Sequence, residues 1–342
     1  MASCPEAAMT GEATAQLPDE RLGIVVIGRN EGERLVACLD SLGALAANAV
    51  YVDSGSSDGS VEMARAKGAA VVDLDLAKPF TASRARNAGF AALQERLPDL
   101  AFVQFVDGDC RLAAGWLDRA AAFLRGRDDV AVVFGRRREL HPERSVYNRM
   151  CDREWDVPIG EALECGGDTL IRAEAFRQVG GYADELIAGE EPDMCVRLRS
   201  AGWRIWRIDA EMTLHDAAMT RFGQWWLRSV RSGHAFAEVS RRHADSPFGI
   251  WKRSTSRALI WGLALPVAAI LGAAWLHPAL LLLLLAYPLQ VARIALRSGG
   301  SKPESWLNAG FATLGKFPEM QGVARFYLSR LSGRRRKLIE YK

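Results

Sequence analysis

The chain has 342 residues, and its 44 lysines and arginines against 41 aspartates and glutamates give a formal net charge of +3. This length can hold one large or two small domains with an ample core, and so nearly neutral a molecule is not expected to bind nucleic acid. The six cysteines show neither a disulfide framework nor paired metal-ligand spacing, which indicates reduced thiols in a cytosolic setting.

Residues 1–20 contain neither a basic start nor an apolar core, so we expect a disordered lead and no signal peptide. Short apolar strands then alternate with helices. We expect strands over 22–27, 49–52, near 71–72 and over 101–106, with a helix after each of the first three. Asn30 followed by Glu33 fits one helix N-terminus, and Thr81 begins another helix. Such alternation is typical of a mostly parallel sheet with helices on both faces.

Two of these strands end on aspartates, Asp53 and Asp107. The carboxyl ends of parallel strands meet at one edge of a sheet, where open α/β folds bind ligands. Asp107 is followed by Gly108 and Asp109, and two carboxylates this near each other repel unless a cation lies beside them. Hard oxygen ligands suit Mg²⁺ or Mn²⁺. The sequence therefore predicts a metal site that holds phosphate, and the alternative is that the two aspartates form only a surface turn.

Four segments in order resemble the family 2 glycosyltransferases, which have a GT-A nucleotide-sugar fold. They are IVVIGRNE (24–31), VDSGSSDGS (52–60), ARNAG (85–89) and DGD (107–109), and the similarity spans residues 22–215. The resemblance implies that Asp53 reads the nucleotide base and that Asp107 and Asp109 serve the sugar diphosphate and its divalent metal. It also implies transfer of a sugar to an acceptor, usually with inversion. One departure is Gly28, which stands where many relatives carry proline.

Other donor-binding candidates lie in the same motifs. A diphosphate needs cationic partners, and arginine offers planar, two-pronged donors, so Arg86 is a candidate, although its helix could equally present it to solvent. Arg29, Glu31 and Asn87 are assigned to the nucleotide with it by the same resemblance. For Asp53 and its loop, the alternative is simply a helix cap at Asp58.

The middle of the chain is less regular. We expect a helix over 114–125, a strand over 130–134, and a solvated face for the basic run 136–138. Residues 163–171 form a glycine-marked turn into a strand, which in this family borders the acceptor pocket. Gly167 would allow a sugar ring close to the backbone. Asp168 is a candidate for acceptor contact, with a structural role as the alternative.

Glu190 and Glu191 precede a proline that suits the first turn of a helix. The helix dipole alone could favour acids there. The position also matches the family's paired-acid motif, in which the second acid is the general base, with Glu191 in place of the more usual aspartate. A base must take the proton from the acceptor hydroxyl, which a carboxylate can do. We expect Glu191 to be that base, and Glu190 stays the alternative.

His215 follows the last expected strand, over 203–208. It could supply a third metal ligand beside Asp107 and Asp109, since imidazole suits Mn²⁺ better than Mg²⁺, or it could be a structural hydrogen-bonding group. Residues 224–234 predict a tryptophan-rich amphipathic helix near a membrane surface or over the acceptor cleft. Trp225 is its candidate acceptor contact, and a helix that only packs is the alternative.

Two apolar stretches, 258–276 and 279–296, each approach the ~20 residues that cross a bilayer. Basic residues flank their outer ends and none lies in the turn between them, which favours a hairpin with both ends cytoplasmic. A buried soluble hairpin, or a re-entrant one bent at Pro266 and Pro288, is the alternative. Residues 306–331 suit an interfacial helix, which a basic tail follows.

These predictions divide the chain into five parts: a disordered lead (1–20), a GT-A domain (21–217), amphipathic connecting helices (218–256), a transmembrane or re-entrant hairpin (257–298), and an interfacial helix with a basic tail (299–342). The expected protein is a glycosyltransferase on the cytoplasmic side of an inner membrane. Its partners would be a nucleotide-sugar donor, Mg²⁺ or Mn²⁺, a glycan or lipid-linked acceptor, and membrane lipids. The alternatives are a catalytically silent sugar-binding subunit and a nucleotidyltransferase, whose glycine- and lysine-rich nucleotide loop has no counterpart here.

Overall fold

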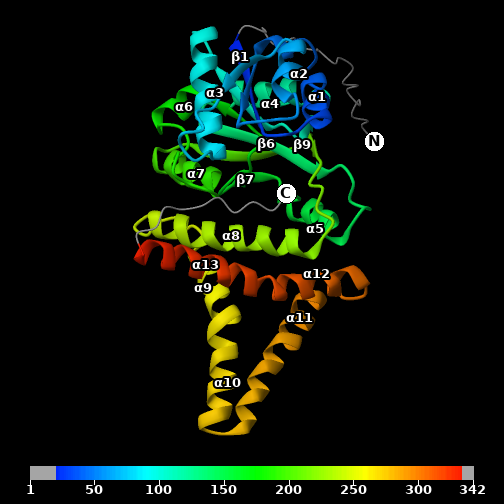
Figure 1. Ribbon diagram of the computed structural model, residues 1–342, viewed down its shortest axis with the longest axis vertical. Coiled ribbons are helices and arrows are strands. Elements are labelled where there is room, and N and C mark those ends of the chain that lie inside the picture. The colour runs from blue at the N-terminus through cyan, green and yellow to red at the C-terminus, as the bar shows by residue number, and fades with distance from the viewer. Residues whose placement is uncertain (1–20, 333–342) are drawn as a thin grey trace, which may run out of the picture.

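The computed structural model describes residues 21–332. The predicted disordered lead and the basic residues 334–337 of the predicted tail lie outside this range. The described chain forms an α/β domain followed by a helical region from which a long hairpin projects (Figure 1).

A mixed sheet forms the centre of the α/β domain, with strand order β3-β2-β1-β4-β8-β6-β9-β5 and with β7 paired to β9. Its strands are β1 (Leu22–Gly28), β2 (Ala49–Asp53), β3 (Ala70–Asp73), β4 (Phe102–Asp107), β5 (Cys110–Leu112), β6 (Val130–Glu139), β7 (Gly160–Ala162), β8 (Thr169–Arg172) and β9 (Arg204–His215). The first four run parallel to their neighbours among themselves, as the alternating pattern predicts. The mixed character comes from β8, which is antiparallel to both β4 and β6.

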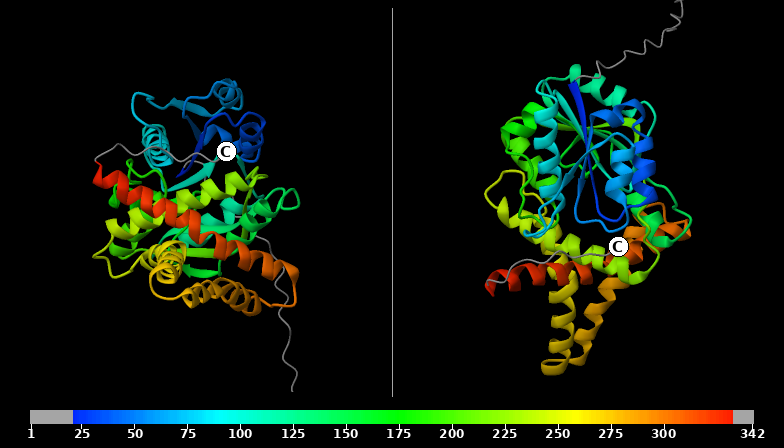
Figure 2. Two further views of the ribbon diagram at one scale, coloured as in Figure 1. Left: turned by 60° about the horizontal axis from the view of Figure 1, so that its bottom comes forward. Right: turned by 45° about the horizontal axis from the view of Figure 1, so that its top comes forward.

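Helices cover both faces of this sheet, and Figure 2 shows α1 and α3 on opposite faces. They are α1 (Glu33–Asp40), α2 (Ser60–Ala66), α3 (Ala82–Arg96), α4 (Trp116–Arg125), α5 (Val146–Glu154), α6 (Ala173–Gln178) and α7 (Glu190–Ser200), with a 3₁₀ turn over Gly43–Asn48. Gly89 lets α3 lie directly on the strands, because a Cβ there would lie 2.9 Å from Val52 Cγ2 and overlap Val25. The central strands are covered on both sides, which explains their near-continuous apolar sequence.

The predicted helix cap at Asn30 is wrong. Helix α1 begins at Glu33 after Gly32, without a side-chain cap. Asn30 adopts a left-handed conformation with φ 56°, which asparagine tolerates better than most residues. Its Oδ1 accepts the Ser57 N–H (2.8 Å), and its own N–H donates to Ser56 Oγ (2.9 Å). The side chain therefore ties the loop after β1 to the loop after β2.

The predicted solvated face at 136–138 is also mostly wrong. Strand β6 continues through these residues because β9 pairs with it as far as Glu139. Arg136 is buried and forms an ion pair with Asp152 (3.0 Å). Arg138 alone is exposed as expected, where it binds Glu211 at 2.7 Å. Arg137 points into the protein, toward the predicted metal site.

A layer of helices lies beneath the α/β domain (Figure 1). It consists of α8 (Phe222–Arg242), α12 (Pro303–Leu314) and α13 (Lys316–Leu331). Gly233 on α8 and Gly322 on α13 mark a close crossing, since a Cβ on either would overlap a carbonyl oxygen of the other helix. The interfacial helix predicted over 306–331 is thus two helices joined at Gly315, and the second packs against α8.

The hairpin projects from this layer. Its first arm joins α9 (Lys252–Leu259), a π-helical turn (Ile260–Ala264) and α10 (Leu265–Trp275), and its second joins a 3₁₀ segment (Pro278–Leu285) and α11 (Ala286–Arg297). By length and composition, Lys252–Trp275 and Pro278–Arg297 could each cross a membrane. Large side chains such as Trp275 (79% exposed) and Leu282 (65% exposed) are uncovered. Among the described residues, the alternative of a buried soluble hairpin is therefore wrong.

Candidate functional site

A cavity of about 1100 Å³ opens at the carboxyl edge of the parallel strands. Its lining comes from the loop after β1, the Asp-Gly-Asp turn after β4, the start of α7, and the helical region. Single small-molecule sites typically occupy about 300–1,000 Å³. The cavity is therefore slightly larger than the upper end of this range.

The sheet register places Asp53 and Asp107 at one edge, as predicted, because Gly28 is paired with Asp53 and Ile27 with Asp107. Both Asp53 oxygens have partners: Oδ1 accepts the Tyr51 hydroxyl (3.0 Å), and Oδ2 accepts the N–H groups of Gly55 and Ser56 (both 2.8 Å). Asp53 thus shapes the loop that borders the cavity, and Ser54 rather than Asp53 lines it. Its predicted contact with the nucleotide base stays a prediction.

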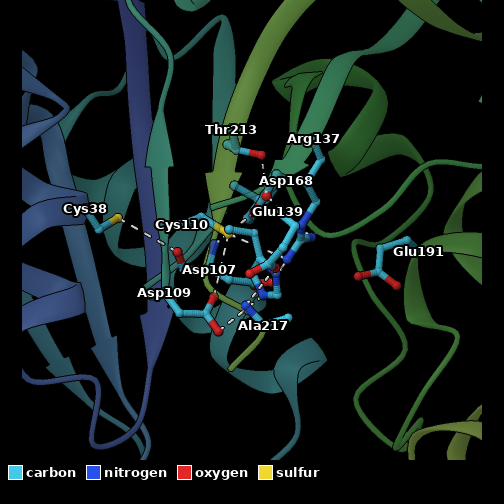
Figure 3. A network of polar contacts seen from close by, with 12 residues as sticks. Cys38, Asp107, Asp109, Cys110, Arg137, Glu139, Asp168, Glu191, Thr213 and Ala217 are labelled. Atoms are coloured by element: carbon cyan, nitrogen blue, oxygen red, sulfur yellow. Dashed lines mark hydrogen bonds and ion pairs between the residues drawn. The ribbon is translucent and has the colours of Figure 1, made fainter. Parts of the chain in front are cut away.

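Strand pairing also explains the approach of His215 to Asp109. Strands β5 and β9 are antiparallel with Cys110 opposite His215, and this brings His215 Nε2 to 3.3 Å from Asp109 Oδ2. Both side chains are buried, and the Cys110 thiol lies beside them, 3.6 Å from Asp109 Oδ1. Asp109, Cys110 and His215 therefore each offer a ligand atom within one small volume. Figure 3 shows Asp109 and Cys110 close together.

The donor set fits a divalent metal. A carboxylate oxygen and an imidazole nitrogen converge, with Asp107 next to them, and this mixed oxygen and nitrogen chemistry suits Mn²⁺ better than Mg²⁺. On the other side of the ring, His215 Nδ1 has no hydrogen-bond partner among residues 21–332 and lies 3.8 Å from Glu139 Oε2. A carboxylate behind a metal-binding histidine commonly orients the ring. Glu139 is thus suitably placed to orient His215.

Arg137 is a site residue that the sequence reasoning missed. Its guanidinium lies 3.6 Å from Asp107 Oδ2 and 3.4 Å from Asp168 Oδ2, and it stacks over the Trp155 ring at 4.9 Å. Burial opposes the charge of Arg137, but Asp168 and Asp107 outweigh it and raise its pKa. The clue in the sequence was that the continuous apolar run 130–134 leads directly into the basic stretch. If the strand continues through that stretch, alternate residues turn inward.

Arg86 joins the Asp-Gly-Asp turn to the paired acids. Its Nη2 donates to Asp107 Oδ1 (2.9 Å), and its Nη1 donates to Glu190 Oε1 (3.1 Å) and Glu191 Oε1 (3.0 Å). The side chain is only 3% exposed, so the solvent-facing alternative for Arg86 is wrong. Burial opposes ionisation of Asp107, yet Arg86 and then Arg137 outweigh it and lower the pKa of that carboxyl.

Glu191 has the electrostatics of a general base. Burial and the neighbouring Glu190 raise its pKa from 4.5 to about 7, with Arg86 opposing the rise. Its side chain is 14% exposed against 6% for Glu190, and both line the cavity. A base works best when its pKa lies near the working pH. These properties favour Glu191 over Glu190 for proton transfer.

Gly167 lies against Arg86 and Glu191, where there is no room for a side chain. A Cβ there would overlap Arg86 Nη2 and lie 3.1 Å from Glu191 Oε1. We therefore expect Gly167→Ala to push Arg86 away from its carboxylates and to lower turnover by at least about tenfold, the factor that corresponds to ~1.4 kcal/mol. The rate of nucleotide release measures this effect.

Gly166→Ala is the matched control, because nothing lies within 4 Å of a Cβ at that position. It should leave turnover unchanged. Equal losses in the two variants would show that the turn merely needs glycine flexibility and that Arg86 is not displaced.

The remaining candidates divide into two groups. Arg29 and Glu31 line the cavity, as expected for donor contacts. Asn87 does not: it binds the backbone of Tyr182 and the Asp184 carboxylate (2.7 Å) and so holds the 182–184 segment against α3.

The two predicted acceptor contacts outside the cavity are Asp168 and Trp225. Asp168 is fully buried, and it accepts hydrogen bonds from the Asp107 N–H (3.1 Å) and the Thr213 hydroxyl (2.9 Å). These contacts fit the alternative of a structural role for Asp168. Trp225 is 4% exposed and packs edge-on against Phe311 of α12. Neither side chain lines the cavity, so this geometry favours the structural alternatives, and the two acceptor contacts stay predictions.

Comparison with known proteins agrees with this geometry. Residues 23–179 match the model of the glycosyl transferase family 2. The pre-mycofactocin glycosyltransferase of Mycobacterium tuberculosis is 27% identical over 178 residues, which are 47% of this chain and 35% of that protein. The succinoglycan biosynthesis protein ExoA of Rhizobium meliloti is 26% identical over 202 residues, 54% of this chain and 60% of that protein.

The chain thus spans only about a third of the length of the first of these relatives. Among solved structures, the mannosyltransferase PcManGT from Pyrobaculum calidifontis, in complex with GDP-Man and Mn²⁺, superimposes with a TM-score of 0.63 at 17% identity. The superposition covers 91% of this chain and 88% of that one, so the two share a fold. The domain that contains residues 23–179 is thus a glycosyl transferase family 2 domain with the GT-A fold.

Proposed function

We propose that this protein is a membrane-attached, metal-dependent glycosyltransferase that moves a sugar from a nucleotide-sugar donor to an acceptor hydroxyl with inversion. The observation that carries the proposal is that one buried arginine, Arg86, bridges Asp107 of the metal and diphosphate motif to Glu191. Glu191 has its pKa raised to about 7 and lines the same cavity. The proposed base and the proposed diphosphate site are thereby linked through one arginine side chain.

In the proposed reaction, Glu191 accepts the proton of the acceptor hydroxyl while the hydroxyl oxygen attacks the anomeric carbon. The bond from that carbon to the diphosphate breaks, and the nucleoside diphosphate leaves from the opposite face, which inverts the anomeric configuration. Asp109 and His215, with Asp107, would hold the metal, and when bound the cation supplies positive charge to the departing diphosphate. Arg86 and Arg137 keep Asp107 ionised throughout, because their cations lie 2.9 Å and 3.6 Å from its carboxylate oxygens.

We further propose attachment to the cytoplasmic side of an inner membrane and an acceptor that is a lipid-linked glycan or polysaccharide precursor. The exposed apolar hairpin and the basic residues at both its ends, including Arg253 and Arg297, support this orientation. Similarity to ExoA, which is named for succinoglycan biosynthesis, supports a polysaccharide pathway.

A donor screen tests the proposal. The detergent-solubilised full chain is incubated with a panel of nucleotide sugars and Mn²⁺, and free nucleotide is measured. We expect release of a nucleoside diphosphate from at least one donor, its loss when EDTA removes the metal, and its return when Mn²⁺ is added in excess. Tight donor binding without release would instead identify a silent sugar-binding subunit. Formation of a nucleoside triphosphate and a sugar 1-phosphate only when pyrophosphate is added would identify a nucleotidyltransferase.

A further inference from the structure

The cavity extends beyond the GT-A domain into the helical region. Phe236 of α8 lines it, as do Trp251 and Ser254 at the start of the first hairpin arm. These side chains line the same cavity as Glu191 and Asp109. The first apolar arm, Lys252–Trp275, therefore begins immediately after a residue that lines the candidate active site.

Trp251 is held in an unfavourable backbone conformation. Its φ of 51° and ψ of 8° are left-handed, a state that bulky residues rarely adopt. Its indole Nε1 donates to Glu164 Oε1 (3.3 Å), and its ring packs edge-on against Phe236 with centroids 5.0 Å apart. Such strain persists only where surrounding contacts maintain it, and it is concentrated at ligand-binding sites.

The indole also touches the helix that carries the base. Gly189 immediately precedes Glu190, and a Cβ at Gly189 would lie 3.0 Å from Trp251 Cζ3. Trp251 thus packs against the N-terminus of α7, where Glu190 and Glu191 begin the helix. The position of its ring is consequently linked to that of the catalytic acids.

From these contacts we infer that Trp251 and Phe236 form an acceptor subsite for an amphiphilic glycoside, meaning a sugar with a hydrocarbon aglycone. The inference rests on the proposed function. The sugar hydroxyl would face Glu191, and its ring would lie against the indole, whose flat apolar face suits the C–H groups of a sugar. The hydrocarbon would leave past Ser254 along the first arm, whose side chains are largely uncovered. The first hairpin arm, as membrane anchor, is then continuous with the subsite formed by Trp251 and Phe236.

Photolabelling tests this subsite without requiring turnover. The probe is dodecyl β-glucoside carrying a diazirine, added to the detergent-solubilised full chain, and labelled peptides are identified by mass spectrometry. We expect labelling within residues 228–236 and 248–257, which dodecyl β-glucoside suppresses at much lower concentration than methyl β-glucoside. Labelling confined to residues 260–297, or equal suppression by both glucosides, would overturn the inference.

Variants make the test specific. Trp251→Ala should lower the labelling of these two segments by about tenfold, and Trp251→Phe, which keeps a ring, should lower it less. Trp275→Ala, at an exposed position of the hairpin, is the matched control and should leave it unchanged. Unaltered labelling in a Trp251→Ala protein with native circular dichroism would contradict the inference.

Donor hydrolysis without the glucoside separates the two proposals. If no donor is hydrolysed although labelling depends on Trp251, the transferase proposal fails and the amphiphile site stands. If a donor is hydrolysed but labelling does not depend on Trp251, the subsite fails and the transferase proposal stands.

Discussion

Glu191→Gln is expected to lower turnover by about 10²–10⁴-fold, the range typical for loss of a positioned base. Glutamine keeps the size of the side chain and an oxygen that can still accept from Arg86 Nη1. It cannot accept the proton of the acceptor hydroxyl, so binding of the donor should persist while transfer is lost. Turnover is measured as nucleotide release with acceptor, and donor affinity by calorimetry.

Glu190→Gln is the matched control, since Glu190 shares the same arginine and is more deeply buried. Its loss should be clearly smaller. A larger loss in Glu190→Gln than in Glu191→Gln would move the role of base to Glu190. Glu191→Asp should retain part of the activity, because a carboxylate remains but is set back from the cavity.

The same residue sets the expected pH dependence. Because the base must be deprotonated and burial raises the pKa of Glu191 to about 7, kcat/KM should rise with pH through that value and then level off. The residual kcat/KM of Glu191→Gln should not show this rise with pH. A wild-type profile that is already flat at pH 5 to 6 would contradict the assignment.

Replacing Arg86 by methionine should cause the largest loss of stability, about 3–5 kcal/mol in the free energy of unfolding. Methionine fills much of the space but removes the cation that lies between Asp107, Glu190 and Glu191. Glu190 and Glu191 then share a buried site without this cation, and Asp107 keeps only the more distant Arg137. Urea unfolding of the detergent-solubilised protein measures the change, and Arg96→Met, an exposed position on the same helix, is the control.

The sign of the pH effect distinguishes lost charge pairing from lost packing. Burial raises the pKa of Glu191 and Arg86 opposes that rise, so without Arg86 the folded-state pKa of Glu191 lies still further above that of the unfolded chain. Its ionisation then destabilises the fold as pH increases. The difference between Arg86→Met and wild type should therefore be larger at pH 8 than at pH 5.5. An equal difference at both pH values would indicate that the side chain contributes through packing alone.

The sequence predicted the parts of this protein that depend on local pattern. Apolar runs that end on aspartates identified β2 and β4, and the parallel order of these strands necessarily brought Asp53 and Asp107 to one edge. His215 was a candidate ligand beside Asp109 because it follows the last expected strand. The observed strand β9 extends as far as His215, and its register with β5 brings His215 to Asp109.

What the sequence did not predict depends on packing between distant segments. The length of β6 is fixed by its partner β9, so the inward position of Arg137 could not be deduced from a basic run. Trp225 and Trp251 are both tryptophans near the same predicted membrane surface. Trp225 packs against α12, whereas Trp251 packs against α7 and faces the cavity. These contacts between distant segments decide the difference.

The glycine crossing of α8 and α13 has a mechanical consequence. The chain leaves the α/β domain through α8 and enters the hairpin. It returns through α12 and α13, and α13 lies against α8 at Gly233 and Gly322. The hairpin is thus clamped at both ends to one rigid layer. If the hairpin is inserted in a bilayer as proposed, this layer acts as a fixed-length spacer rather than a flexible tether. The catalytic acids would then stay at one height above the lipid surface, and acceptors would be selected by how far their hydroxyl protrudes.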